Sequence, residues 1–165
     1  MESRSVFLAD AAATEAFGRD LAHQWLQRQA ENPSERGGGE QAPILLLQGD
    51  LGAGKTCLVQ GIAAGLGIDE PITSPTFALA QHYRGSTGGR STALVHLDLY
   101  RLELAAAADE LFAQEEEEAL GLRALMAVEW SERLSFLPED AWSIRLELID
   151  TNRPEAGRRA HLITT

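Results

Sequence analysis

The sequence of 165 residues contains a single cysteine, Cys57, and no apolar run long enough to cross a membrane. One cysteine excludes an intrachain disulfide and a zinc site built from cysteines. A membrane-spanning helix needs about 20 consecutive apolar residues. The N-terminus carries Glu2, Arg4 and Asp10 in place of a basic region followed by an apolar run. We therefore expect a cytoplasmic protein without a secretion signal.

Basic residues are also scarce. Fourteen Lys and Arg against 25 Asp and Glu give a formal net charge of −11 at pH 7. Such a charge repels a phosphate backbone and removes the electrostatic attraction that dominates nonspecific nucleic-acid binding. Direct binding of DNA or RNA by this chain alone is therefore disfavoured, unless a local basic patch or a partner protein overrides the average.

What the chain does contain is enough apolar sequence for a packed core. The length and a 44% share of hydrophobic residues predict a single globular domain. Apolar residues recur at helical spacing over 10–30, where Asp10 is a candidate N-cap. The polar segment 31–42 holds three consecutive glycines and lacks periodicity, which predicts a mobile loop.

The rest of the chain alternates between strand and helix patterns. The run 44–47 is apolar throughout, as in a strand buried on both faces of a parallel sheet, and a helix follows as far as Gly65 and Gly67. The remaining expected elements are an antiparallel hairpin at 77–99 with a loose tip at 85–89, a helix at 105–119, a strand at 124–128, a short helix at 131–137 and a closing hairpin at 142–164. This order predicts an α/β fold with a mainly parallel central sheet, flanking helices and antiparallel hairpins.

A glycine-rich loop lies between the 44–47 strand and the next helix. It matches the pattern G-x-x-x-x-G-K-[ST] and reads Gly49-Asp50-Leu51-Gly52-Ala53-Gly54-Lys55-Thr56. Its glycines let the backbone turn tightly, and its N–H groups and the helix N-terminus form a cradle for phosphate. Lys55 would neutralise the β- and γ-phosphates of a nucleotide, and the Thr56 hydroxyl would coordinate Mg²⁺. The loop therefore predicts a P-loop NTPase domain that binds ATP and Mg²⁺.

A P-loop also needs a carboxylate near its metal ion. Two candidates follow apolar strands, Asp98 after 94–97 and Glu129 after 125–128. Because their placement is equivalent, the pattern alone does not choose between them. The alternative interpretation of either residue is a solvated carboxylate at a strand end.

Four blocks of sequence together are more specific than any one motif. They are the glycine-rich loop, Thr73-Ser74-Pro75-Thr76-Phe77, His96-Leu97-Asp98-Leu99-Tyr100-Arg101-Leu102, and Val128-Glu129-Trp130. In this order they resemble the TsaE family, also called YjeE, and the resemblance covers nearly the whole chain. It implies a bacterial ATPase required to form N6-threonylcarbamoyladenosine in tRNAs that decode codons beginning with A. The ATPase would act with TsaB and TsaD while TsaC supplies the threonylcarbamoyl-adenylate donor, so its contact with tRNA would be indirect.

The same resemblance implies roles for individual residues. Thr56 and Glu129 would be the Mg²⁺ ligands, and Asp98 would orient or deprotonate the attacking water near the γ-phosphate. Thr76 would sense the γ-phosphate as a switch residue. Catalysis would thus depend on Lys55, Thr76 and Asp98. The nucleotide would contact Thr14, Gly49, Asp50, Leu51, Gly52, Ala53, Gly54, Lys55, Thr56, Cys57, Trp130 and Arg158, with Thr14 and Arg158 near the base.

This chain departs from the family pattern in two places. Cys57 stands where a second threonine is common, and the segment 105–122 matches the pattern least. Within that segment, the acidic run 115–118 is expected to be a solvated helix face rather than a docking surface. His96 is expected to pack on its strand. For Arg101, an arginine finger and a structural ion pair are equally compatible with the sequence.

Three other functions remain open on the residues alone. A small-molecule kinase shares this length and loop, but it would carry an acceptor-binding helix and an arginine-rich lid where the 77–99 hairpin is expected. A GTPase would carry an N-K-x-D stretch, which the sequence lacks. A nucleotide-gated interaction module with negligible hydrolysis would use the same loop as an ATPase.

Overall fold

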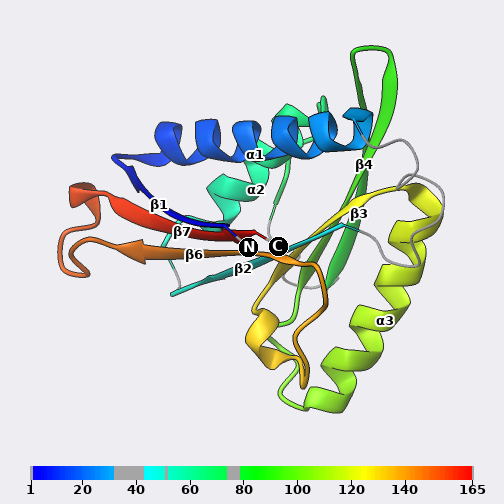
Figure 1. Ribbon diagram of the computed structural model, residues 1–165. Helices are drawn as coiled ribbons and strands as arrows, with labels where there is room; N and C mark the ends of the chain where they lie inside the picture. The colour runs from blue at the N-terminus through cyan, green and yellow to red at the C-terminus, as the bar shows by residue number, and fades with distance from the viewer. Residues whose placement is uncertain (1, 32–42, 51, 74–78, 165) are drawn as a thin grey trace.

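The fold is a mixed α/β arrangement around one seven-stranded sheet (Figure 1). The computed structural model describes residues 2–31, 43–50, 52–73 and 79–164. Its strands are β1 (Glu2–Leu8), β2 (Ile44–Gly49), β3 (Ala80–Thr87), β4 (Arg90–Asp98), β5 (Leu125–Glu129), β6 (Trp142–Leu148) and β7 (Arg158–Thr164). The helices are α1 (Ala11–Glu31), α2 (Lys55–Gly65) and α3 (Ala105–Leu122), with short 3₁₀ turns η2 (Ser131–Arg133) and η3 (Pro154–Ala156).

The centre of the sheet is parallel and its margins are antiparallel. The strand order is β1-β7-β6-β2-β5-β4-β3, and β2 pairs in parallel with both β5 and β6, while β4 pairs in parallel with β5. The pairs β3–β4, β6–β7 and β1–β7 are antiparallel. The expected mainly parallel centre and both expected hairpins are therefore confirmed for the described residues.

Helices cover the two faces of the sheet and create two apolar cores. Figure 1 shows α1 and α2 on one face and α3 on the other. Because successive side chains of a strand point to opposite faces, Leu45 and Leu47 of β2 belong to the core beneath α1 and α2. Ile44 and Leu46 belong to the core beneath α3. This two-sided burial explains why β2 is apolar throughout.

The helix expected at 10–30 is present as α1 and begins with the expected cap. The carboxylate of Asp10 accepts a hydrogen bond from the Ala13 backbone N–H at 2.8 Å, which satisfies one of the free donors of the first turn. Glycines then let α1 pack tightly on α2. A Cβ at Gly61 would collide with the Glu15 carbonyl, and a Cβ at Gly18 would collide with the Leu58 carbonyl. At these two glycines the backbones of α1 and α2 therefore lie in direct contact.

Several expectations about individual elements need correction. The tip of the first hairpin is a tight two-residue turn at Gly88 and Gly89, whose φ angles of 57° and 77° suit a type I′ turn. The α3 helix extends three residues further than expected, to Leu122. Only 131–133 of the short helix expected at 131–137 is helical.

Strand β1 was not expected from the sequence. Its side chains are exposed except for Leu8, which is buried, and Val6, which is half-buried. It thus lacks the apolar alternation that marks a strand, and it exists because it pairs with β7 from Glu2↔Thr164 to Leu8↔Arg158.

The acidic run at 115–118 is not uniformly a solvated face. Glu115 is buried, and its Oε2 lies 2.6 Å from Nε2 of His82 on β3. Glu117 and Glu118 are exposed, as expected. Glu116 is half-buried, and burial raises the pKa of its carboxyl. The first glutamate of the run therefore joins α3 to the hairpin.

Part of the sequence-based interpretation falls outside the described residues. This holds for the predicted loop except Glu31, for Leu51, for Thr76 and for the first residues of the 77–99 hairpin. Within the described ranges, none of the helices combines the length and apolar character that crossing a membrane requires.

Candidate functional site

The glycine-rich loop connects the carboxyl end of β2 to the first turn of α2. Gly49, Gly52 and Gly54 have φ angles of 144°, 83° and 108°, values that residues with a side chain rarely adopt. Within the part of the chain that the structure describes, nothing lies within 4 Å of a Cβ built at Gly52. The Ala53 N–H closes a turn onto the Asp50 carbonyl at 3.0 Å. The loop therefore turns on its glycines and is open above Gly52.

The first turn of α2 presents donors without side-chain partners. Gly54 occupies the N-cap position, and none of the described side chains caps the helix. The free N–H groups at a helix N-terminus attract anions. Thr56 and Cys57 follow in this turn and are half-buried. The start of α2 thus offers backbone N–H groups to an anion.

Lys55 is a buried cation in the same turn. It is 7% exposed, its Nζ donates a hydrogen bond to the Gly49 carbonyl, and Nζ lies 4.5 Å from the centroid of the Trp130 ring. Among the described residues, no ion pair joins Lys55 to a carboxylate. A buried ammonium group without a counter-charge is costly, so this position favours an incoming anion.

The two candidate carboxylates lie side by side at the ends of adjacent strands. Asp98 of β4 and Glu129 of β5 are register partners. They alternate with Leu97 and Val128, which belong to the core beneath α3, so both carboxylates face the side of the sheet that carries α2. Asp98 is half-buried and its Oδ1 accepts from the Tyr100 backbone N–H at 2.9 Å, whereas Glu129 is 3% exposed.

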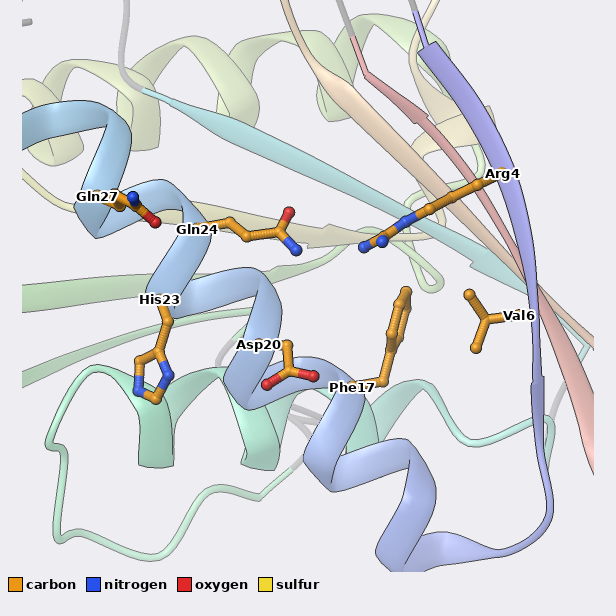
Figure 2. A pocket seen from close by; sticks show the side chains of 7 residues that line it. All are labelled: Arg4, Val6, Phe17, Asp20, His23, Gln24 and Gln27. Carbon is orange, nitrogen blue, oxygen red and sulfur yellow. The ribbon is translucent and has the colours of Figure 1, made fainter. Parts of the chain in front are cut away.

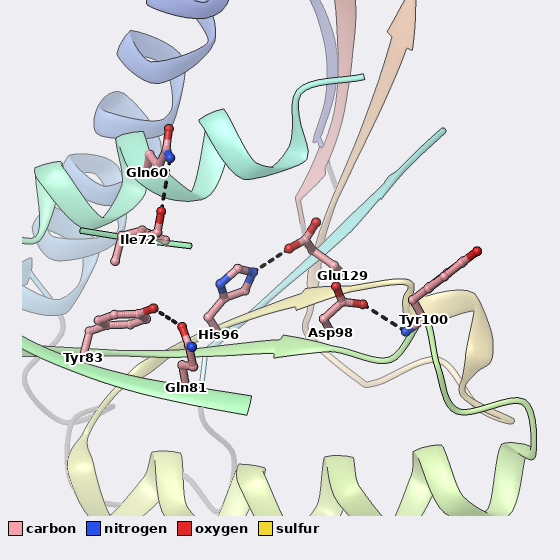
Figure 3. Close-up of polar contacts among 8 residues, drawn as sticks. All are labelled: Gln60, Ile72, Gln81, Tyr83, His96, Asp98, Tyr100 and Glu129. Carbon is pink, nitrogen blue, oxygen red and sulfur yellow. Dashed lines mark hydrogen bonds and ion pairs between the residues drawn. The ribbon is translucent and has the colours of Figure 1, made fainter. Parts of the chain in front are cut away.

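Glu129 has a buried histidine as its partner. Nε2 of His96 lies 2.6 Å from Oε2 of Glu129, and His96 is completely buried (Figure 3). His96 therefore packs on its strand as expected, but it also makes a polar contact that the sequence analysis did not predict. The available signal was its position two residues before Asp98, which puts both side chains on one face of β4.

The Trp130 ring contacts both Lys55 and a second aromatic ring, that of Tyr100. Trp130 has a left-handed backbone, with φ at 60°, and its ring centroid lies 4.8 Å from that of Tyr100. The guanidinium carbon of Arg133 lies 5.8 Å from the centroid of the Tyr100 ring. The aromatic pair thus lies between two cations, and Tyr100 is a member of the site that the sequence analysis missed.

The two residues expected near the nucleotide base, Arg158 and Thr14, have different surroundings in the structure. Arg158, at the start of β7, donates from Nη1 to the Ala53 carbonyl at 3.3 Å, and a Cβ at Gly54 would lie 2.5 Å from the same nitrogen. Thr14 is completely buried in α1, where its hydroxyl donates to the Asp10 carbonyl at 2.9 Å. Arg158 therefore lies against the glycine-rich loop, while the hydroxyl of Thr14 is used within its own helix.

A separate cavity of about 360 Å³ lies between β1 and α1. Figure 2 shows that Arg4 and Val6 of β1 face a row of α1 side chains across it. The guanidinium carbon of Arg4 lies 5.9 Å from the centroid of the Phe17 ring. None of the predicted site residues that the structure describes lines this cavity, and most of its described walls are exposed polar side chains.

Comparison with known proteins identifies the family of this chain. A family model described as "Threonylcarbamoyl adenosine biosynthesis protein TsaE" matches residues 8–159. A Synechocystis protein named "tRNA threonylcarbamoyladenosine biosynthesis protein TsaE" is 43% identical over 139 residues, which cover 82% of this chain and 75% of that protein. A Haemophilus influenzae protein of the same name is 32% identical over 160 residues, which cover 93% of this chain and 87% of that protein.

The fold is likewise similar to that of a solved structure. The crystal structure of Bacillus subtilis YdiB superposes with a TM-score of 0.63 over 99% of this chain and 86% of that chain, at 22% sequence identity. That similarity concerns the fold alone. The matches to the family model and to its named relatives cover most of the sequence, from β1 to β7, and therefore show that this chain belongs to the TsaE family.

Proposed function

We propose that this protein is a P-loop ATPase that holds the phosphates of ATP in the glycine-rich loop. The buried and uncompensated Lys55 carries the proposal. Its side chain starts from the first turn of α2, which no described side chain caps, next to the glycine-rich loop. An ATP phosphate would supply the missing negative charge, and the open space above Gly52 fits the close approach of a phosphate to the backbone.

The side chains beside the loop fit a magnesium ion. Mg²⁺ prefers oxygen ligands and is usually held by one or two carboxylates together with substrate phosphates and water. Thr56 and Glu129 would supply the protein oxygens, and within the described ranges no group of three His, Cys, Asp or Glu side chains forms a complete metal cage. When bound, Mg²⁺ would neutralise charge on the β- and γ-phosphates.

Other residues of this chain would bind the nucleotide and take part in its hydrolysis. Lys55 would bind the β- and γ-phosphates, and Asp98 would orient or deprotonate the water that attacks the γ-phosphate. Thr76 would respond to the γ-phosphate as a switch residue. Trp130 would pack beside the nucleotide, and Arg158, already against the loop at Ala53, would contact it near the base.

The names of the relatives support a role in forming threonylcarbamoyladenosine in tRNA. We propose that the protein acts in the cytoplasm with TsaB and TsaD and that ATP hydrolysis supports turnover of their complex. The protein would not perform the transfer itself. Its hydrolysis would be slow alone and faster with the partners, because the partner would complete or stabilise the hydrolytic arrangement.

The hairpin β3–β4 lies where a small-molecule kinase would carry its acceptor-binding helix, so the kinase alternative is less favoured. No observation favours a GTPase. A nucleotide-gated module would bind ATP as the proposed ATPase does but would not hydrolyse it. Only a measurement of ATP hydrolysis therefore distinguishes the two.

A direct test is phosphate release from ATP by the purified chain, with and without the TsaB–TsaD complex. We expect Mg²⁺-dependent release that rises when the complex is added. A folded protein that binds ATP but releases no phosphate under either condition would favour the gated module. Phosphate transfer to a small acceptor would instead favour a kinase.

A further inference from the structure

A buried polar pair formed by His96 and Glu129 lies beside the candidate site. Nε2 and Oε2 are 2.6 Å apart, and the two side chains are 0% and 4% exposed. Figure 3 shows the imidazole of β4 directed along the sheet toward the carboxylate at the end of β5. Because a carboxylate oxygen only accepts, the histidine donates this hydrogen bond from Nε2.

The sheet register explains why these two side chains meet. Glu129 is the register partner of Asp98, and His96 is the register partner of Ala127. His96 and Glu129 are therefore diagonal neighbours on one face of a strand pair, within reach of long side chains. Asp98 lies on the same face, directly beside Glu129. The histidine thus approaches the carboxylate from the interior of the sheet, opposite the open strand ends.

Packing alone explains His96 poorly. Toward the sheet interior its neighbours on this face are Leu94, Leu125 and Ala127, buried in the core beneath α1 and α2, while the polar Asp98 and Gln81 adjoin it on β4 and β3. The other ring nitrogen, Nδ1, is buried and has no hydrogen-bond partner among the residues that the structure describes. Leaving a buried polar group unpaired costs about 1–3 kcal/mol. A leucine at this position would fill a similar space without that cost.

The hydrogen bond controls how Glu129 is presented. Oε2 is occupied by His96, and the Glu129 carboxylate makes no other hydrogen bond within the residues that the structure describes. Oε1 is therefore the oxygen left for another ligand. A hydrogen bond buried away from water is stronger than an exposed one, so it holds the carboxylate in one orientation.

We propose that His96 is a positioning residue that holds Oε2 of Glu129 and thereby presents Oε1 to the divalent cation of the nucleotide site. This inference rests on the proposed function. Residues that orient metal ligands typically change metal affinity by about 10- to 100-fold when they are replaced. His96 would not contact the nucleotide, so it would act on the metal and leave metal-free nucleotide binding unchanged.

Two substitutions separate the hydrogen bond from the packing. His96→Leu removes the donor and keeps an apolar side chain, whereas His96→Gln keeps an amide donor close to the position of Nε2. The readout is Mn²⁺ affinity of the ADP-bound protein, measured by electron paramagnetic resonance, which requires no turnover. ADP affinity in the presence of a chelator is measured alongside, and circular dichroism checks folding.

We expect His96→Leu to weaken Mn²⁺ binding by about tenfold or more and to leave metal-free ADP affinity unchanged. His96→Gln should remain much closer to the unmutated protein. In a Glu129→Ala background, His96→Leu should add no further loss, because both substitutions remove the same interaction. Unchanged Mn²⁺ affinity in folded His96→Leu would overturn the proposal, as would a further loss in the Glu129→Ala background.

The remaining outcomes are also decisive. If His96→Leu does not fold, His96→Gln carries the test: near-normal Mn²⁺ affinity supports positioning, and affinity as low as that of Glu129→Ala overturns it. If the unmutated protein binds no ADP, the proposed function fails. If it binds ADP and no Mn²⁺ accompanies the nucleotide, ADP binding stands and the positioning role is overturned.

Discussion

Lys55 is the residue at which stability and the proposed function conflict most clearly. Its ammonium group is buried, with the Gly49 carbonyl and the Trp130 ring as its contacts and no ion pair among the described residues. An apolar side chain would be easier to bury at this position. The free-energy cost of burying this charge is explained if Lys55 is positioned to bind a phosphate group.

Replacing this lysine should therefore separate binding from folding. Hydrogen bonds to charged groups contribute about 1.5–3 kcal/mol, so we expect Lys55→Met to weaken Mg-ATP affinity by at least about tenfold. The free energy of unfolding without nucleotide should remain within about 1 kcal/mol or increase, because an uncompensated buried charge is removed. Calorimetry with Mg-ATP and urea unfolding measure the two quantities. Unchanged affinity in the folded variant would show that Lys55 does not hold the nucleotide.

Replacing each of the adjacent carboxylates, Glu129 and Asp98, should impair a different property of the protein. Glu129→Ala should lose the Mg²⁺ dependence of ATP binding as well as hydrolysis. Asp98→Ala should keep substantial ATP binding and lose turnover, because orienting water matters more in the transition state than in the ground state. Titrations of nucleotide at several Mg²⁺ concentrations, together with phosphate release, distinguish them. The opposite pattern would exchange the two roles.

At the scale of elements, the contact between α1 and α2 depends on glycine. Gly61 faces the backbone carbonyl of Glu15, and a Cβ at Gly65 would lie 2.7 Å from the Ala22 Cβ. The α2 helix begins at the glycine-rich loop, so this packing also fixes the helix that carries Lys55 and Thr56. Backbone atoms cannot rotate away as a flexible side chain can, which makes the contact intolerant of added volume.

Gly61→Ala should consequently destabilise the protein even though alanine is the better helix former. Overpacking a tight contact typically costs about 1–3 kcal/mol, which outweighs a gain in helix propensity of up to about 1 kcal/mol. Gly121→Ala is the matched control, because Gly121 lies on exposed α3 surface and a Cβ there would meet nothing within 4 Å in the described structure. We expect the control to be neutral or slightly stabilising in thermal unfolding. A Gly61→Ala protein as stable as the control would contradict the close packing.

At the scale of the whole molecule, net charge shapes the choice of partner. The formal charge of −11 opposes a polyanion such as tRNA, although the relatives are named for a tRNA modification. The proposed resolution is that tRNA meets this protein only through the TsaB–TsaD complex.

The purified chain should therefore not bind tRNA at physiological salt. Gel-shift titration with tRNA, with and without ATP, measures this directly, and the same titration with TsaB–TsaD present should show a shifted complex. If any tRNA binding remains, it should depend on the basic side chains of the chain. Neutralising Lys or Arg should abolish this residual binding, whereas removing Asp or Glu should not. Tight binding by the isolated chain would indicate a basic patch that the average charge conceals.

Features encoded in short stretches of sequence were predictable. Asp10 and the periodicity that follows it determine the start of α1, the apolar run 44–47 determines a strand buried on both faces, and the spacing of Gly49, Gly52, Gly54 and Lys55 determines where the loop turns into a helix. In each case the backbone preferences and burial pattern of neighbouring residues suffice. The residues for the candidate site could be named on this basis, together with the resemblance to the TsaE family.

What only the tertiary structure decided is which of these residues meet. The contact between His96 and Glu129 joins residues 33 positions apart, and the contact between Arg158 and Ala53 joins residues 105 apart. The burial of Glu115 and the existence of β1 depend in the same way on His82 and on β7. The amino-acid order specifies side-chain chemistry and local periodicity, but strand order and register, which bring distant side chains together, arise from packing the whole sheet between its helices.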